Sequence, residues 1–294
     1  MVIGAFVIRK IVKMLNKELN MLKYSVSQWI FGEESIAESI ERLKKYHYDG
    51  IELAGEPNKI NIQETKDLLK RNDMVCTSLC GIYTEDRNLS SSSENVRTKA
   101  IQYLKDCIDM AAKLGAPVII VVPSTVGKFS PDDTCGEAWE YGVDSLKKAG
   151  EYAAAKKIKL AIEAINRYET FLVYNLELAL KFVNEVNSPN VQLMADSFHM
   201  NIEERNNQAS LQLAAPRLIH IHIADNTREA AGMGKIDFKD VMSTLKMIGY
   251  KGCITMEFLP PVADPYQTDK HAQTKDVYDA FARQSIEHMK KFDA

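Results

Sequence analysis

Short apolar runs alternate with longer amphipathic stretches along this chain from residue 23 nearly to its end. The apolar runs have the length of strands and are separated by polar or glycine-containing segments, which predicts buried β-strands. The stretches between them repeat apolar residues at helical spacing and predict α-helices. The expected strands cover 24–30, 50–54, 74–80, 117–122, 159–164, 191–195, 218–224 and 253–258. The expected helices cover 35–46, 62–72, 94–114, 138–157, 176–187, 207–214, 238–248 and 272–291.

Strands that each precede a helix predict an α/β fold in which a parallel sheet closes into a (β/α)8 TIM barrel. Two helix ends carry clear signals, because Gly115 closes a long amphipathic run and Asp237 can cap a helix that begins at Phe238. An open doubly wound sheet is the alternative, but the glycine fingerprint common after its first strand is absent from the sequence. Since no Ser/Gly-rich linker interrupts the pattern, we expect one catalytic domain over 23–294.

Residues 1–22 differ from the rest of the chain and are expected to form a helical N-terminal extension. The apolar piece at residues 2–8 comes before the basic residues, which is the reverse of a secretory signal. Basic side chains then alternate with apolar ones, as in an amphipathic helix: Arg9, Lys10, Lys13 and Lys17. We expect this helix to pack on the domain; the alternative is an over-long start, since Met14 and Met21 both precede the first expected strand.

Composition narrows the class of protein. A chain of 294 residues with 46% hydrophobic and 26% charged residues is typical of a soluble globular protein with a sizeable core. The net charge of −3 does not favour nucleic acid or an anionic membrane as a partner. No apolar run reaches the ~18 residues that a membrane span needs. The 5 cysteines lack the spacing of a zinc site, so we expect reduced thiols and a cytoplasmic location.

Four ionisable residues stand near the C-terminal ends of successive predicted strands: Glu163, Asp196, His222 and Glu257. In a parallel barrel these ends converge on the face that carries the active site. A carboxylate in a run such as LAIEAI is costly to bury unless it is paired or binds a metal. We therefore predict that the four residues bind one divalent metal ion, with Mn²⁺ as the first expectation and Mg²⁺ or Co²⁺ as alternatives. His220 shares a strand face with His222 but lies farther from the strand end, so we expect it to be a buried neighbour.

Several segments resemble the sugar phosphate isomerase/epimerase family, the xylose-isomerase-like barrels that include the D-tagatose and D-psicose (allulose) 3-epimerases. The resemblance covers roughly residues 23 to 260 and is most specific over the last four predicted strands. The segments are AIEAINRYE at 161–169, MADSFHMNIEE at 194–204, HIHIADNTR at 220–228 and MGKIDF at 233–238.

The resemblance implies roles for individual residues. Glu163 and Glu257 would form the acid/base pair in addition to binding the metal, and Glu169, His199 and Arg228 would hold the oxygens of the substrate. The implied reaction is that of a metal-dependent ketose 3-epimerase, in which a proton next to the ketone is removed to give an enediolate and then returned on the other face. By contrast, Glu203 and Glu204 are expected to be solvated or capping charges.

The sequence also allows other substrates and other reactions for the same site residues. A sugar phosphate or a keto-inositol could be the substrate, and the reaction could be a 1,2-isomerisation. Strand four, in PVIIVVPSTVG, lacks the aromatic residue that ketose 3-epimerases of this group often place at its end, so the wall beside the sugar would come from elsewhere, with Trp29, Tyr83 and Trp139 as candidates.

Two further classes are weighed against an epimerase. A three-zinc apurinic endonuclease shares this barrel, but it needs extra histidines on the early strands, and the sequence offers none at the ends of strands two to four. A non-catalytic sugar-binding barrel would not need the second glutamate. We expect a small-molecule sugar as the partner, neither nucleic acid nor membrane, and assembly as a homodimer or homotetramer.

Overall fold

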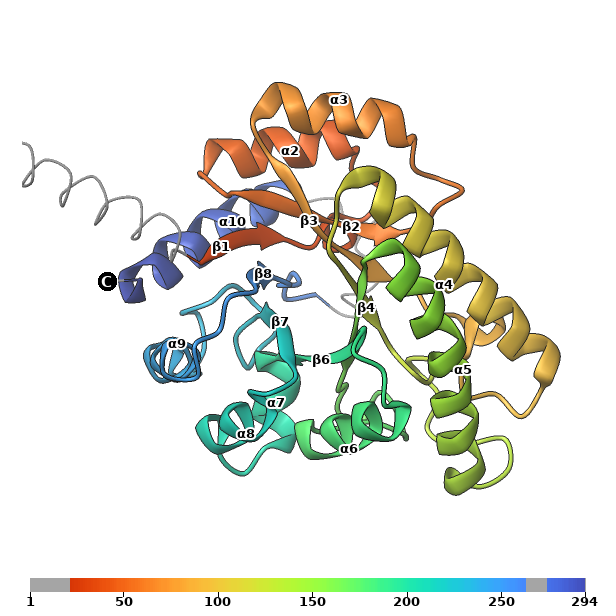
Figure 1. The fold of residues 1–294 in the computed structure, drawn as a ribbon. Helices are drawn as coiled ribbons and strands as arrows, with labels where there is room; N and C mark the ends of the chain where they lie inside the picture. The colour runs from red at the N-terminus through yellow and green to blue at the C-terminus, as the bar shows by residue number, and fades with distance from the viewer. Residues whose placement is uncertain (1–21, 263–273, 294) are drawn as a thin grey trace, which may run out of the picture.

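The computed structural model describes residues 22–262 and 274–293, so the predicted extension at 1–22 lies almost wholly outside the described residues. Eight parallel strands follow one another in the order β1-β8-β7-β6-β5-β4-β3-β2, and an isolated bridge between Ser27 and Glu52 links β1 to β2. The sheet is therefore a nearly closed barrel (Figure 1). The strands are β1 (Lys23–Val26), β2 (Gly50–Gly55), β3 (Val75–Gly81), β4 (Val118–Val121), β5 (Lys159–Glu163), β6 (Val191–Asp196), β7 (Leu218–Ile223) and β8 (Cys253–Met256).

Helices surround the sheet and complete the predicted TIM barrel (Figure 1). They are α2 (Ile36–Lys45), α3 (Ile62–Asn72), α4 (Glu94–Leu114), α5 (Cys135–Lys156), α6 (Leu176–Val186), α7 (Ser197–Glu203), α8 (Asn207–Ala214), α9 (Phe238–Met247) and α10 (Thr274–Met289). Short 3-10 helices lie at η1 (Gln28–Phe31), η2 (Glu85–Arg87) and η4 (Lys290–Phe292). No helix among the described residues is both long and apolar enough to span a membrane.

The ends of several helices follow from local side-chain chemistry. Ser35 opens α2 with a capping box, because its side chain accepts from the Glu38 amide while Glu38 accepts from the Ser35 amide. Both predicted helix ends are confirmed. Gly115 ends α4 at φ 77°, a left-handed conformation that glycine adopts without strain, and the Asp237 side chain caps α9.

Residues alternate between the two sides of each strand and form two cores. The larger core lies between the strands and the helices. A second cluster of Val118, Ile120, Ala161 and Met194 comes from the alternate positions of β4, β5 and β6, which face the barrel interior. On the opposite strands the interior is polar: Ser25 Oγ lies 2.7 Å from Thr255 Oγ1 and accepts from Thr77 Oγ1 at 3.0 Å. The barrel interior is therefore apolar on one side and hydrogen-bonded on the other.

Three predicted details are wrong. The first strand ends at Val26 rather than residue 30, because residues 28–31 form η1. Helix α7, with 7 residues, was not expected after Asp196; it is too short to show a helical repeat of apolar residues. Glu203 is not solvated: its side chain is 1% exposed and pairs with Arg167. Glu204 does act as a capping charge, since it accepts from the Leu176 amide at the start of α6.

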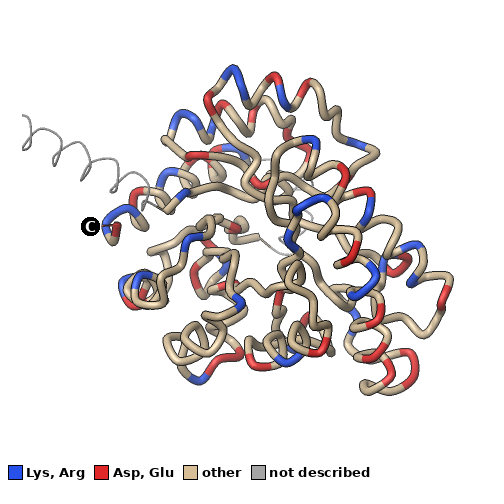
Figure 2. Tube along the Cα trace, viewed as in Figure 1, with Lys and Arg blue, Asp and Glu red and all other residues tan. Residues whose placement is uncertain are grey.

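Charged positions are mixed along the outer helices. Figure 2 shows basic and acidic residues following one another along α2, α3 and α4, without a continuous stripe of one sign on these helices. A surface that grips a nucleic-acid backbone concentrates Lys and Arg on one face. The charge pattern of these helices therefore does not favour the nuclease reading.

Candidate active site

Glu163, Asp196, His222 and Glu257 converge at the C-terminal ends of β5 to β8, as the sequence predicts. All four are buried, and one donor atom from each lies within 4.8 Å of the others. His222 Nδ1 lies 3.1 Å from Glu257 Oε2 and 3.9 Å from Glu163 Oε1. Glu163 and Asp196 are the last residues of their strands, and Glu257 follows β8 directly, so the parallel sheet itself brings the side chains to one point.

The side-chain atoms of this cluster suit a divalent cation. Asp196 Oδ2 and His222 Nδ1 are buried and make no well-aligned hydrogen bond to the described part of the chain, and the charged atoms nearest to them are Arg228 Nη1 at 3.2 Å and Glu257 Oε2 at 3.1 Å. The other carboxylate oxygen of Asp196 accepts from the Phe198 amide at 2.8 Å, which leaves Oδ2 directed at the cluster. Since buried polar atoms nearly always make a well-aligned hydrogen bond, these two atoms keep the capacity to bind a cation. Three carboxylates and one imidazole form the oxygen-rich ligand set that Mn²⁺ or Mg²⁺ accepts.

The two glutamates have opposite pKa shifts. Burial raises the pKa of Glu163 well above its usual range, and the neighbouring Glu257 carboxylate raises it further. Burial also acts to raise the pKa of Glu257, but His222 and Arg228 outweigh it and the pKa lies below its usual range. Burial raises the pKa of Asp196 to about 6. Two carboxyl groups held in different protonation states are a common feature of acid/base catalysis.

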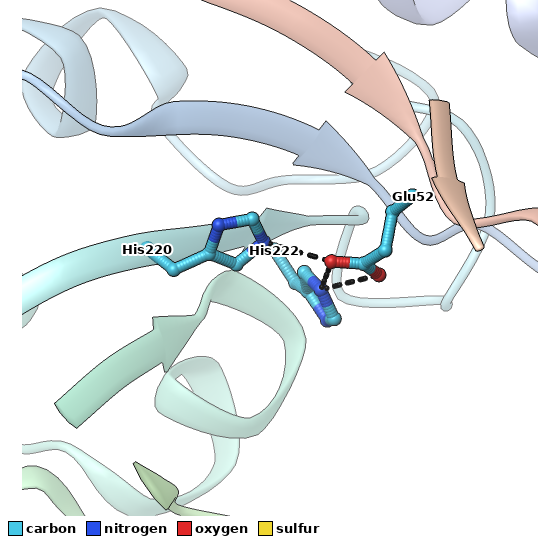
Figure 3. A group of neighbouring side chains, drawn as sticks. All are labelled: Glu52, His220 and His222. Atoms are coloured by element: carbon cyan, nitrogen blue, oxygen red, sulfur yellow. Dashed lines mark hydrogen bonds and ion pairs between the residues drawn. The ribbon is translucent and has the colours of Figure 1, made fainter. Parts of the chain in front are cut away.

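Glu52 was not predicted from the sequence as a site residue. It contacts the side of the His222 ring that points away from Glu163 and Glu257. This fully buried side chain on β2 has Oε1 at 3.0 Å from His222 Nε2 and Oε2 at 3.0 Å from His220 Nε2 (Figure 3). Ser78 Oγ donates to Glu52 Oε2 at 2.6 Å. His220 is a buried neighbour, as predicted. The available signal for Glu52 was a lone carboxylate inside the apolar run GIELAG.

Arg228 and His199 face the cluster from the loop after β7 and from α7. Arg228 Nη2 donates to Glu257 Oε2 at 2.6 Å, and Nη1 lies 3.2 Å from Asp196 Oδ2. His199 Nε2 lies 3.3 Å from Arg228 Nη1 and 3.8 Å from Asp196 Oδ2. Burial lowers the pKa of His199 well below its usual range, and the Arg228 charge lowers it further, so the imidazole is neutral.

Glu169 joins the site through Asn166, a residue not singled out in the sequence. Asn166 Nδ2 lies 2.8 Å from Glu169 Oε1, to which it donates, and 2.8 Å from His199 Nδ1. Asn166 thus fixes the orientation of the His199 ring, with Nε2 directed toward Arg228 and Asp196. All seven predicted site residues therefore lie in one connected group, with Glu169 at its half-buried edge.

Trp29 connects this group to a cavity at the same end of the barrel. Trp29 Nε1 donates to Glu257 Oε1 at 2.8 Å. The same residue lines a cavity of about 520 Å³ together with residues from the loops after β1, β2 and β3. Of the other aromatic candidates for a substrate wall, Tyr83 is buried against Tyr103, and Trp139 packs on Phe182 of α6. Trp29 is therefore the candidate that contacts the cluster.

The profile of the xylose isomerase-like TIM barrel family matches residues 40–284. The chain is 33% identical over 221 residues to an L-ribulose 3-epimerase from Methylomonas sp. (strain DH-1), across 74% of this chain and 77% of that protein. It is 30% identical over 254 residues to the 3-dehydro-D-guloside 4-epimerase of Escherichia coli (strain K12), across 84% and 95%. The solved structure of a D-allulose 3-epimerase from Methylomonas sp. in complex with D-allulose is similar, with a TM-score of 0.80 and 29% identity over 92% of this chain and 97% of the other. The strand order, the four converging side chains and these matches together show that the chain belongs to the xylose isomerase-like TIM barrel family.

Proposed function

We propose that this chain is a divalent-metal-dependent epimerase that inverts C3 of a neutral ketose. The observation that carries the proposal is the convergence of Glu163 and Glu257, from β5 and β8, on one buried point with Asp196 and His222 between them. Two carboxyl groups from well-separated strands can reach a bound sugar from different sides. Inversion of a carbon needs this arrangement, because one group removes the proton and the other returns it on the opposite face.

The two glutamates can serve as one acid and one base, since the pKa of Glu163 is shifted up and that of Glu257 is shifted down. In one direction Glu257 would accept the proton from C3 and Glu163 would return one on the opposite face. After the transfer the two roles are exchanged, which is what the reverse reaction requires. Trp29 holds Glu257 Oε1 and so orients the carboxylate.

The remaining site residues bind and orient the substrate. Arg228 presents two guanidinium nitrogens in a fixed fork that can donate to sugar oxygens, and His199 lies beside it with Nε2 directed toward the cluster. Glu169, held by Asn166, can accept from a hydroxyl. A divalent ion held by Glu163, Asp196, His222 and Glu257 would act as a Lewis acid that stabilises the negative charge of the enediolate.

The cavity beside Trp29 favours a neutral sugar over a sugar phosphate. Among the described residues its lining carries the carboxylates of Glu33, Glu34 and Glu56 and the ammonium group of Lys59. Glu34 is paired with Arg42, and Glu56 is paired with Arg87 and with Lys59 at 3.7 Å. A phosphate group is normally bound by Arg clusters, Lys or helix N-termini. The described lining presents no such cluster of cations to a phosphate.

A second candidate function is epimerisation at C4 of a 3-keto glycoside. The E. coli 3-dehydro-D-guloside 4-epimerase matches over 95% of its length. The cavity of about 520 Å³ falls in the range of roughly 300–1,000 Å³ that small-molecule sites occupy. In addition, the chain after β4 runs Pro123, Ser124 and Thr125, with no aromatic ring to close the far side of a monosaccharide.

Hydrogen exchange at the substrate carbon tests both candidates. The Mn²⁺-loaded protein is incubated in D₂O with a panel of free ketoses and 3-keto glycosides, and NMR locates the deuterium. We expect deuterium at C3 of a free ketose together with its C3 epimer; deuterium at C4 of a keto glycoside would favour the second candidate. Glu163→Gln and Glu257→Gln should each slow epimerisation by about 10²–10⁴, whereas Glu140→Gln, at an exposed position of α5, should leave the rate unchanged. Exchange that persists at the full rate in both site variants would contradict the two-base mechanism.

A further inference from the structure

Glu52 is a buried carboxylate that the proposed proton transfers do not use. It is 0% exposed and belongs to β2, on the far side of the barrel from Asp196. His222 Nε2 lies 3.0 Å from Glu52 Oε1 and 3.3 Å from Oε2, as Figure 3 shows. The other nitrogen of the same ring, Nδ1, faces Glu163 and Glu257. The imidazole of His222 is thus held between Glu52 and the proposed metal site.

The strand register aims these side chains at each other. The pairing register of β2 with β3 shifts between Ile51 and Glu52. Ile51 pairs with Cys76, but Glu52 pairs with Ser78. The register between β6 and β7 shifts in the same way just before His220. A β-bulge re-aims the side chains that follow it. The unpaired residue of the first shift is Thr77 on β3, directly before Ser78, which donates to Glu52; that of the second is Ile219 on β7, directly before His220.

We propose that Glu52 is a positioning residue for the metal site: it accepts the Nε2 proton of His222, which fixes the ring and leaves the Nδ1 lone pair directed at the metal. The proposal rests on the proposed function, in which His222 is a ligand. A histidine ligand commonly donates its second ring N–H to a carboxylate, which fixes its tautomer and raises its strength as a ligand. Here that carboxylate comes from β2, whereas the proposed ligands come from β5, β6 and β7 and from the residue after β8.

Metal affinity measured without substrate tests this role. The metal-free protein is titrated with Mn²⁺ by calorimetry and with Co²⁺ by visible absorption, and we expect one ion per chain. Glu52→Met replaces the carboxylate by an unbranched side chain of similar length that cannot accept the proton. We expect its Mn²⁺ affinity to fall about 10–100-fold and the Co²⁺ bands to shift. Glu52→Gln keeps one acceptor oxygen, so its loss should be smaller, about tenfold or less, but measurable.

A matched control separates positioning from general damage to the barrel interior. Ser25→Ala removes a buried hydroxyl that bonds Thr255 and Thr77 but is not bonded to Glu52 or His222. We expect this variant to keep the Mn²⁺ affinity and the Co²⁺ spectrum of the unmodified protein. An equal loss in Ser25→Ala and Glu52→Met would overturn the proposal.

Other outcomes are equally decisive. If Glu52→Met does not fold, Glu52→Gln decides the matter: an affinity and a Co²⁺ spectrum equal to those of the unmodified protein would refute the positioning role. Two Mn²⁺ ions per unmodified chain, of which one is lost on Glu52 substitution, would make Glu52 and His220 ligands of a second ion instead. A protein that binds one ion tightly but epimerises no sugar would contradict the proposed function and leave the role of Glu52 intact.

Discussion

Replacing Arg42 by methionine should destabilise the barrel at the junction of α2 and α10. The Arg42 side chain on α2 is only 8% exposed and pairs with Glu34, whose side chain is 2% exposed. Its Nε also donates to Asp279 of α10 at 2.7 Å. The guanidinium lies 4.8 Å from the centre of the Phe31 ring. Arg42→Met removes the charge but retains much of the apolar stem, so the variant isolates the electrostatic part of this contact.

The expected loss follows from the burial of each partner. Removing one member of a buried ion pair costs about 3–5 kcal/mol, because the other charge is left uncompensated. The cation–π contact adds roughly 0.5–1 kcal/mol. The Asp279 pair adds little, since that side chain is 35% exposed and keeps Lys45 as a partner at 2.6 Å. We therefore expect the free energy of unfolding to fall by about 4 kcal/mol, read in guanidinium chloride as a lower midpoint with an unchanged slope.

A double variant tests the reason for this loss. In Arg42→Met with Glu34→Gln, no buried charge remains unpaired, so most of the lost stability should return. Arg42→Lys keeps a positive charge near Glu34 but lacks the guanidinium group that also reaches Asp279. Its free energy of unfolding should therefore lie between those of the unmodified protein and Arg42→Met. If the double variant is as unstable as Arg42→Met alone, the cost does not come from an unpaired Glu34, and the electrostatic explanation is wrong.

Three further outcomes are expected at the active site. Chelation should abolish epimerisation, and Mn²⁺ added back at 100 times its dissociation constant should raise the free energy of unfolding by about 2.7 kcal/mol, measured by thermal or denaturant melting. Trp29→Phe keeps the ring but loses the donor to Glu257, so kcat should fall about tenfold or more while the melting temperature stays the same; an unchanged kcat would show that this hydrogen bond does not orient the base. Arg228→Lys keeps the charge but cannot reach Asp196 and Glu257 together, so kcat/KM should fall at least about tenfold in steady-state assays; full activity would mean that only the charge matters.

The alternating pattern of strands and helices in the sequence predicts both the barrel and the convergence of the four site residues. Parallel strands joined by helices end on one face, so residues at equivalent positions, such as Glu163 and Asp196, meet even though 33 residues separate them. This argument needs only the strand pattern. The strand expected at 253–258 ends two residues earlier, at Met256, but the position of Glu257 was still predictable, because the residue that follows a strand lies on the same face.

Contacts across the barrel were not predictable in this way. The contact of Glu52 with His222 depends on the barrel closing and on two register shifts, and neither leaves a mark in the apolar pattern. The link from Asn166 to His199 depends on α7, whose 7 residues are too few to show a repeat. Short helices and bulges are set by tertiary packing, so local sequence carries little information about them.

Asp196 limits how this centre could be re-engineered. Its Oδ1 accepts from the Phe198 amide at the first turn of α7, while Oδ2 is the oxygen available to a cation. A designer who exchanged it for glutamate or histidine to change metal preference would also remove the cap of the helix that carries His199. Exchanging Glu163 would instead remove one of the two proposed acid/base groups, so a change at β5 would affect catalysis and a change at β6 would affect the start of α7.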